Sequence, residues 1–211
     1  TRRLSSAASD VYKRQVNGLR ACAKKGFLQV LQRQKIDIMA LQEVRAFPEQ
    51  LPDNVLNPRG WHTVFSPATR PGYSGVAIYS RVQPTRVETS LGEARFDDEG
   101  RFLLAQFGRL SVASVYFPKG SGKDRDNSRV PYKMDFYRAV FERIQLQRKV
   151  GPVFVTGDYN TAHHTIDIAR PKSNLKASGF LPEERDELSR WEQAGWAVSY
   201  THLTLPTTVF V

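Results

Sequence analysis

The stretch GPVFVTGDYN at residues 151–160 is the part of the sequence around which we expect the fold to form. Its apolar run, residues 153–155, is typical of a strand that is buried on both faces. Gly157 lets the chain turn sharply, and Asp158 and Asn160 then leave the strand end. Side chains two residues apart in an extended chain point to the same side, so the carboxylate and the amide should converge. Together they could hold a metal, orient a water or bind a phosphate, and an Asx turn that caps the strand is the alternative.

The composition indicates one globular domain with a basic surface. The chain has 211 residues, of which 40% are hydrophobic, and its mean hydropathy is −0.45. These values suit a single soluble domain. The excess of 31 Lys and Arg over 21 Asp and Glu gives a formal net charge of +10. Such a charge favours a polyanionic partner, nucleic acid before membrane, although a solvated surface rich in arginine is the alternative.

No feature of the sequence indicates a membrane or an oxidising compartment. No apolar run is long enough to span a bilayer, and the first residues lack the order of a signal peptide. Cys22 is the only cysteine, which excludes a disulfide framework and a cysteine zinc site. A reducing cytoplasm is the expected location.

Both ends of the sequence differ in character from the part between them. Residues 1–15 are small, polar and basic without a sustained period, and residues 199–211 are rich in threonine. We expect residues 1–15 to be a disordered or artefactual tail and residues 199–211 to be a second tail. Residues 16–198 should form one domain.

Apolar periodicity predicts strands that alternate with helices. Further strands are predicted at 37–41, 61–65, 75–80, 84–90, 102–107 and 110–116, and helices at 26–34, 132–149 and 183–193. Two of the strands form a hairpin, so the sheets should be mixed. Glu43 and Tyr116 again place polar groups at strand ends. The alternatives are a residue in the first turn of a helix for Glu43 and a buried packing residue for Tyr116.

Two polar connections carry many charged residues. Residues 121–129 form one loop, and residues 161–181 form a connection whose length is usually functional in a compact domain. The second contains the adjacent histidines His163 and His164. Neighbours in an extended chain point to opposite faces, so we expect these two neither to bind one ion together nor to be catalytic.

The sequence resembles the endonuclease/exonuclease/phosphatase superfamily, and within it the bacterial exodeoxyribonuclease III and AP endonuclease group. The matching segments are VNGLRA (16–21), DIMALQEV (37–44), GYSGVAIYSR (72–81), VYFPKG (115–120), GDYNTAH (157–163) and SGFLPEER (178–185). The LQE and GDxN patterns occur across the superfamily. SGFLPEER, together with VYFPKG and NGLRA, is more specific for the DNA-repair branch. The resemblance covers residues 16–198.

The resemblance implies an α/β (α+β) fold, a two-sheet sandwich flanked by helices, and a role for each candidate residue. Glu43 would be the main ligand of a divalent ion, with Asp158, Asn160 and Asn17 close to it. The ion would be Mg²⁺, which suits few carboxylates with waters and phosphate, or Mn²⁺. Asp158 would orient and deprotonate the attacking water, and Asn160 would hold the phosphate. Tyr116 would hydrogen-bond the phosphate or assist the leaving group.

The implied function is a DNA-repair phosphodiesterase that works as a monomer on double-stranded DNA and abasic-site DNA. It would cut 5′ of abasic sites, remove 3′-blocking groups and degrade 3′ ends. The residues expected to contact DNA phosphates are Lys119, Lys123, Arg125, Arg170 and Lys172. A catalytically dead DNA-binding fragment and a superfamily phosphatase acting on lipids or inositol phosphates are the alternatives.

The sequence departs from the family pattern at two places. Gln15 stands where the family usually has an Asn, and we assign it no role because a longer amide could reach the site only with a shifted backbone. The family also has a catalytic Asp and a terminal Ser-Asp-His segment downstream of the position of Trp196, and this sequence contains neither. We therefore expect the domain to be incomplete and the chain to be nearly inactive, and a chain extended through such a segment to be more active.

Overall fold

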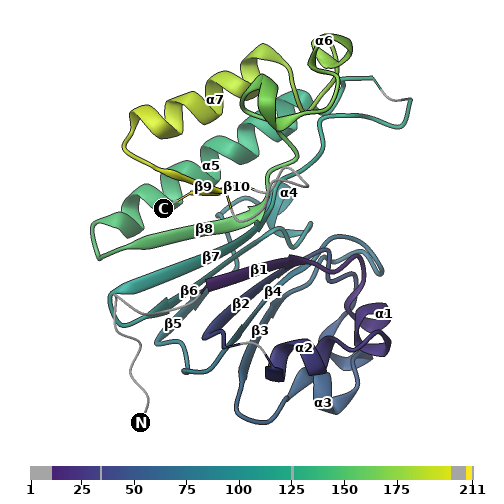
Figure 1. The fold of residues 1–211 in the computed structure, drawn as a ribbon, viewed down its shortest axis with the longest axis vertical. Coiled ribbons are helices and arrows are strands. Elements are labelled where there is room, and N and C mark those ends of the chain that lie inside the picture. Colours follow the sequence, from purple (N-terminus) through teal and green to yellow (C-terminus); the bar gives the residue numbers. More distant parts are fainter. Residues whose placement is uncertain (1–10, 34, 125, 201–207, 211) are drawn as a thin grey trace.

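The computed structural model describes residues 11–33, 35–124, 126–200 and 208–210. Two sheets pack face to face, with helices on the outer side of each (Figure 1). The first sheet has the order β1-β2-β4-β3, formed by Val11–Gln15, Ile38–Gln42, Val76–Ser80 and His62–Ser66. The second has the order β5-β6-β7-β8-β10-β9, formed by Arg86–Glu88, Phe102–Phe107, Leu110–Tyr116, Val153–Asp158, Thr208–Phe210 and Val198–Tyr200.

Both sheets contain parallel and antiparallel neighbours. Strand β1 runs parallel to β2 and β7 runs parallel to β8, whereas the other paired strands are antiparallel. The β6–β7 hairpin turns at Gly108, whose φ of 64° suits the tight two-residue connection. The arrangement confirms the expected α/β fold with mixed sheets in a sandwich flanked by helices.

The central strands of the first sheet are buried on both sides. Ile38 and Ala40 of β2 pack toward the second sheet, whereas Met39 and Leu41 pack against the helices outside the first sheet. This division follows from the period of two residues along a strand. Every residue of β2 and β4 is buried, which explains why these strands are continuous apolar runs.

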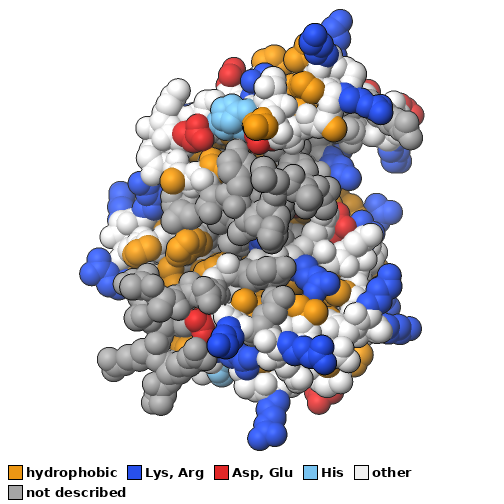
Figure 2. All heavy atoms as spheres, viewed as in Figure 1, with side chains coloured by type: hydrophobic (Ala, Val, Ile, Leu, Met, Phe, Trp, Pro, Cys, Tyr) orange, Lys and Arg blue, Asp and Glu red, His pale blue; other side chains and the backbone are white. Residues whose placement is uncertain are grey.

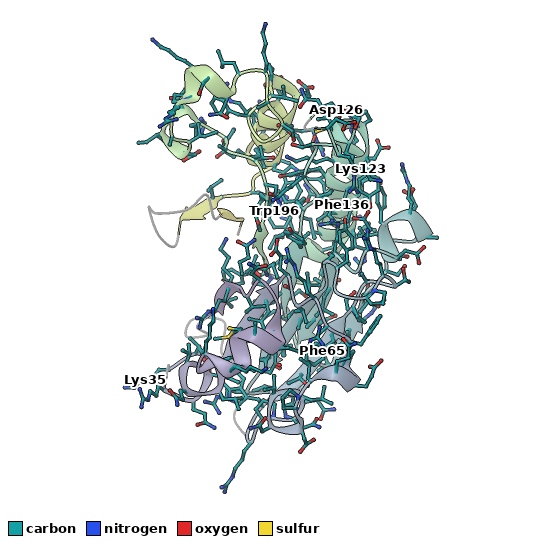
Figure 3. The ribbon with its side chains drawn as sticks, turned by 90° about the vertical axis from the view of Figure 1, so that its right-hand side faces the viewer. Lys35, Phe65, Lys123, Asp126, Phe136 and Trp196 are labelled. Atoms are coloured by element: carbon teal, nitrogen blue, oxygen red, sulfur yellow. The ribbon has the colours of Figure 1, made fainter. Side chains whose placement is uncertain are left out.

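The helices cover the two outer faces. Those on the first sheet are α1 (Leu19–Lys24), α2 (Phe27–Arg33) and α3 (Asp53–Leu56), and those on the second are α5 (Val130–Arg148) and α7 (Pro182–Gln193). The short helices α4 and α6 are formed by Ala94–Asp97 and Pro171–Asn174. Figure 3 shows Lys35 and Phe65 in the half that contains the first sheet, and Phe136 and Trp196 in the other half. Within the described ranges, no helix has both the length and the apolar character needed to cross a membrane.

An aromatic cluster anchors the chain just after β8. Tyr159 is fully buried, and its ring stacks on Phe117 with 4.4 Å between the centroids and 19° between the planes. Tyr137 of α5 donates its hydroxyl hydrogen to the Tyr159 carbonyl (2.7 Å). The backbone is thereby fixed between Asp158 and Asn160, which are only half-buried.

Gly157 serves close strand pairing. Strand β8 continues through Gly157 to Asp158, so the predicted sharp turn at this glycine is wrong. A Cβ added at Gly157 would lie 2.0 Å from the Val115 carbonyl oxygen of β7. The glycine therefore lets the backbones of β7 and β8 approach each other at the strand ends.

Two segments that the sequence assigns to tails contribute strands. Residues 11–15 form β1, in parallel register with β2 from Val11 opposite Ile38 to Gln15 opposite Gln42. Strands β9 and β10 extend the second sheet beside β8. Ladders join backbone groups, so the polar composition of a segment does not keep it out of a sheet. The remainder of the two predicted tails lies outside the described residues.

A buried ion pair joins α5 to α7. Lys133 Nζ lies 2.8 Å from Glu184 Oε1, and both side chains are completely buried. The Glu184 carboxylate also accepts hydrogen bonds from the backbone N–H groups of Gly179 (2.6 Å) and Leu181 (3.0 Å). Lys133 donates a second hydrogen bond to the Asn160 carbonyl (2.7 Å). Both charges are therefore compensated, as burial away from water requires.

Breaking this pair should destabilise the fold strongly. Lys133→Met leaves the Glu184 carboxylate buried without its counter-charge, so the free energy of unfolding should fall by about 3–5 kcal/mol. Urea unfolding followed by circular dichroism measures the loss. The control is Lys149→Met at the exposed end of α5, which should change it by less than about 0.5 kcal/mol. Adding Glu184→Gln to Lys133→Met should recover part of the lost free energy of unfolding. If Lys133→Met loses no more than the control variant, the buried ion pair does not stabilise the fold as described.

Candidate active site

Four polar side chains from strand ends meet at one edge of the sandwich. Tyr116 and Asp158 are the last residues of β7 and β8 and are partners in the ladder. Glu43 directly follows β2 and accepts a hydrogen bond from the Tyr116 hydroxyl. Asn160 donates its backbone N–H to Asp158 Oδ1 (3.0 Å). The structure thus brings together Glu43, Tyr116, Asp158 and Asn160, which are far apart in the sequence.

Two of these residues have a left-handed backbone. The φ angles are 59° at Glu43 and 49° at Asn160, which costs on the order of 1–3 kcal/mol per residue and must be held by the surroundings. At Glu43 the carbonyl accepts the Gly18 N–H (2.7 Å). At Asn160 the carbonyl accepts from Lys133, and the side-chain Nδ2 donates to the Phe117 carbonyl (2.9 Å). Two of the candidate site residues are therefore held in a strained backbone conformation by hydrogen bonds from their surroundings.

The surroundings of Asp158 favour its protonated form. Burial is the largest cause that raises the pKa of Asp158 above its ordinary range, and the Glu43 carboxylate acts in the same direction. The Asn160 N–H, Lys13 and Lys119 have the opposite effect on this pKa. Because the Glu43 carboxylate disfavours the charged form of Asp158, a nearby divalent cation would favour it.

The oxygen atoms at this place fit a hard cation. Glu43 and Asp158 offer carboxylates, and Asn160 offers its amide oxygen because the amide nitrogen is bonded to the Phe117 carbonyl. Mg²⁺ prefers oxygen ligands and binds through one or two carboxylates while it keeps several waters. The oxygen atoms of Glu43, Asp158 and Asn160 are therefore of the kind that a hard divalent cation prefers.

The backbone of Asn17 lies beside the site. Its φ is 46°, and the next residue, Gly18, is hydrogen-bonded to the Glu43 carbonyl. The Asn17 side chain is exposed and, within the described ranges, forms no hydrogen bond with Glu43. Its place close to the metal stays a prediction.

Tyr116 is held as a protonated hydrogen-bond donor. Burial, followed by the hydrogen bond to Glu43, raises the pKa of Tyr116 well above its ordinary range. The Arg101 guanidinium lies 4.7 Å from the centre of the Tyr116 ring and donates to the Tyr116 carbonyl (3.1 Å). Arg101 is itself buried and paired with Glu99. No motif in the sequence marks Arg101 as a site residue.

Strand β1 adds two residues that the sequence analysis left without a role. Gln15 Nε2 donates to Asp158 Oδ2 (3.1 Å), and Lys13 Nζ donates to the Gly157 carbonyl (2.7 Å). Burial lowers the pKa of Lys13 to about 7, against the opposite effect of the Asp158 carboxylate. Gln15, to which we assigned no role, therefore contacts Asp158, because the pairing of β1 with β2 places it there. Lys13 and Gln15 are two residues apart, so their side chains point to the same side of a strand. This spacing was the feature of the sequence that could have indicated a shared role.

The residues predicted to contact DNA lie mostly on two exposed loops. Lys119 is close enough to Asp158 to lower its pKa. Lys123, Arg170 and Lys172 are exposed, and Arg125 lies outside the described residues. Figure 2 shows Lys and Arg side chains along the upper right edge of this face, over the region of α6.

One side chain joins these two loops. Asn127 donates its Nδ2 hydrogen to the Lys176 carbonyl (3.0 Å) and accepts the Ser178 N–H at Oδ1 (3.1 Å). Ser178 Oγ in turn accepts the Gly120 N–H (3.0 Å). These hydrogen bonds hold the two loops together, and each loop carries exposed lysine or arginine side chains.

A groove lies on the other side of Glu43. Arg45 forms an ion pair with Glu43 Oε2 (3.1 Å) and borders a cavity of about 790 Å³. Arg20 and Lys24 of α1 also line this cavity. Positive side chains thus flank the four site residues on both sides.

Comparison with known proteins identifies the family of this chain. The Endonuclease/Exonuclease/phosphatase family matches residues 16–209. An exodeoxyribonuclease of Bacillus subtilis is 34% identical over 189 residues, which cover 89% of this chain and 73% of that protein. Recombination repair protein 1 of Drosophila melanogaster is 35% identical over 189 residues, again 89% of this chain, which therefore spans only 27% of that relative.

The fold is also shared with solved structures. The 3′ phosphatase NExo from Neisseria, solved with a product DNA hairpin, has a TM-score of 0.82 at 22% identity, and the match covers 97% of this chain and 86% of that one. Together with the sequence matches, this likeness confirms the resemblance to the exodeoxyribonuclease III and AP endonuclease group. The chain belongs to the Endonuclease/Exonuclease/phosphatase family.

Proposed function

We propose that the chain is a divalent-metal-dependent phosphodiesterase of the exodeoxyribonuclease III and AP endonuclease type, acting on double-stranded DNA. The observation that carries the proposal is the convergence of Glu43, Tyr116, Asp158 and Asn160 between positively charged surfaces. Relatives are named as an exodeoxyribonuclease and as an endonuclease for apurinic or apyrimidinic sites. The proposed activities are cleavage at abasic sites, 3′–5′ exonuclease action and removal of 3′ phosphates.

The proposed roles follow from the contacts of each residue. Glu43, with oxygens of Asp158 and Asn160, would hold Mg²⁺ or Mn²⁺, which when bound neutralises charge on the phosphate. Asp158 orients the attacking water and takes its proton. Tyr116 keeps its own proton and can donate a hydrogen bond to a phosphate oxygen or to the leaving group. One amide hydrogen of Asn160 is bonded to the Phe117 carbonyl, and the other is available for a hydrogen bond to the same phosphate.

The proposed binding mode is electrostatic and independent of sequence. Lys123, Arg170 and Lys172 would contact backbone phosphates on one side of the site, and Arg20 and Lys24 on the other. Since one chain supplies all four site residues, we propose a monomer as the active unit.

Cleavage of an abasic-site duplex tests the function directly. With Mg²⁺ and enzyme in excess over DNA, even the slow cleavage expected of this chain should be measurable, and EDTA should stop the reaction. Asp158→Asn should slow cleavage by about 10²- to 10⁴-fold because it removes the general base while keeping the shape of the side chain. Single-turnover rates on labelled duplexes give the comparison.

The matched control is Asp135→Asn on the exposed side of α5, which should leave the rate unchanged. An inositol phosphate serves as the competing substrate. Cleavage that persists in EDTA or in Asp158→Asn contradicts the roles, and Mg²⁺-dependent release of phosphate from inositol phosphate in preference to DNA contradicts the substrate.

The fall of the rate in acid should report the protonation of Asp158. Asp158 must be deprotonated to act as a base, and its pKa is raised. Lys13, with a pKa of about 7, is charged throughout this acid range and lowers the pKa of Asp158. Lys13→Met should therefore move the acid midpoint to higher pH. Rates measured against pH for Lys13→Met and the exposed control Lys35→Met would contradict this if both midpoints stayed at the wild-type value.

Salt dependence tests the DNA surface. Replacing Arg170 and Lys172 with alanine should reduce the slope of log K against log salt by about 2, because each phosphate contact contributes about 0.9. Fluorescence anisotropy on two unrelated duplexes should show the same weakening for both. The control pair is Arg109 and Lys149, exposed at the opposite end of the second sheet from Tyr116. An equal slope for the two double variants would mean that the DNA binds to another surface of the protein.

A further inference from the structure

Two histidines and a glutamate gather beside the C-terminal part of α7. The ligand atoms of His163, His164 and Glu192 all lie within 4.8 Å of one another. The imidazole rings are 3.8 Å apart between centroids, with 30° between their planes. The prediction that these neighbours point to opposite faces is wrong, because the chain forms no strand here and strand alternation does not apply.

Ser189 is the hydrogen-bond partner of His163 Nε2, at 2.8 Å from its Oγ, and the tautomer of the ring decides which of the two donates. Ser189 Oγ also lies 3.2 Å from the Arg185 carbonyl, and a hydroxyl that donates there accepts from His163 Nε2. In that tautomer the neutral ring carries its hydrogen on Nε2 and a lone pair on Nδ1.

The Nδ1 atom of His163 has no hydrogen-bond partner among the residues that the structure describes. The side chain is 4% exposed, so this atom is also shielded from water. The Glu192 Oε1 atom lies 3.7 Å from it. Two acceptors that face each other across this gap repel, unless a cation or a proton lies between them.

We propose that His163, His164 and Glu192 bind a divalent transition metal, for which Zn²⁺ is the best fit. Two imidazoles and a carboxylate are a common zinc donor set, whereas Mg²⁺ prefers oxygen. The hydrogen bond from His163 Nε2 to Ser189 is the outer-shell contact that usually orients a ligating histidine. His164 and Glu192 are exposed and can turn to bring their ligand atoms to about 2 Å from the ion. A water would take the fourth position.

The ion would act as a clamp. His163 and His164 begin the connection that leads to Arg170 and α6, and Glu192 lies in the last turn of α7. At present the Arg185 side chain joins the two segments through the His163 carbonyl (2.8 Å). Ser189 of α7 joins them as well, through His163 Nε2. Zinc would add a further cross-link and fix the connection that begins at His163 to α7, a role separate from the proposed chemistry at Asp158.

Titration calorimetry with Zn²⁺, in buffer with excess Mg²⁺ to occupy the oxygen-rich site, tests the proposal. The full chain should bind one equivalent of Zn²⁺, and His164→Ala and Glu192→Gln should each weaken binding by at least about tenfold. Ser189→Ala keeps all three ligands but removes the orienting acceptor, and should weaken binding by about 10–100-fold. Circular dichroism without metal establishes that each variant is folded.

Other histidines and the thiol provide the controls. His62→Ala, His202→Ala and Cys22→Ser should retain the affinity of the wild type. Zn²⁺ should raise the midpoint of thermal unfolding of the wild type but not of Glu192→Gln. Co²⁺ should give the intense visible bands of a four-coordinate site only when both exposed ligands are present. No Zn²⁺ binding, or wild-type affinity in both His164→Ala and Glu192→Gln, would overturn the proposal.

Discussion

The fully buried pair of Lys133 and Glu184 is the interaction on which the arrangement of the site depends. Neither charge is compatible with the interior alone, so α5 and α7 must keep the two side chains in contact. The same lysine holds the carbonyl of Asn160, whose left-handed backbone needs such support. The same glutamate holds residues 178–181 through backbone N–H groups. The packing of α5 against α7 therefore helps to fix the backbone at the edge of the sandwich where the polar groups meet.

The site lies where the ends of strands from both sheets come together. Parallel pairing of β7 with β8 puts Tyr116 beside Asp158, and Gly157 allows the close backbone approach that this pairing needs. Glu43 arrives from the other sheet at the end of β2 and is bonded to Tyr116. Relative movement of the two sheets would separate these side chains, so the tightly packed core between the sheets is also what keeps the site assembled.

The parts of this arrangement that side-chain patterns encode could be predicted. The apolar run of β8 and the spacing of Asp158 and Asn160 gave the central strand and its polar end, and Tyr159 between them anchors the chain in the core. The pairing of β1 could not be predicted, because ladder hydrogen bonds are formed by the backbone and leave no mark in composition. Arg101 was missed for a related reason, since its contact with Tyr116 arises only when distant segments pack.

The hydrogen bonds of Asn127 affect how the two loops bind a ligand. Because one amide joins the loop of residues 121–129 to the segment of residues 176–178, the charges on the two loops are held in one array before anything binds. Little conformational freedom then remains to be lost on association, so more of the electrostatic attraction appears as affinity. The asparagine carries no charge itself, yet the spacing of the surrounding charges depends on it: the surface is preorganised by a neutral residue.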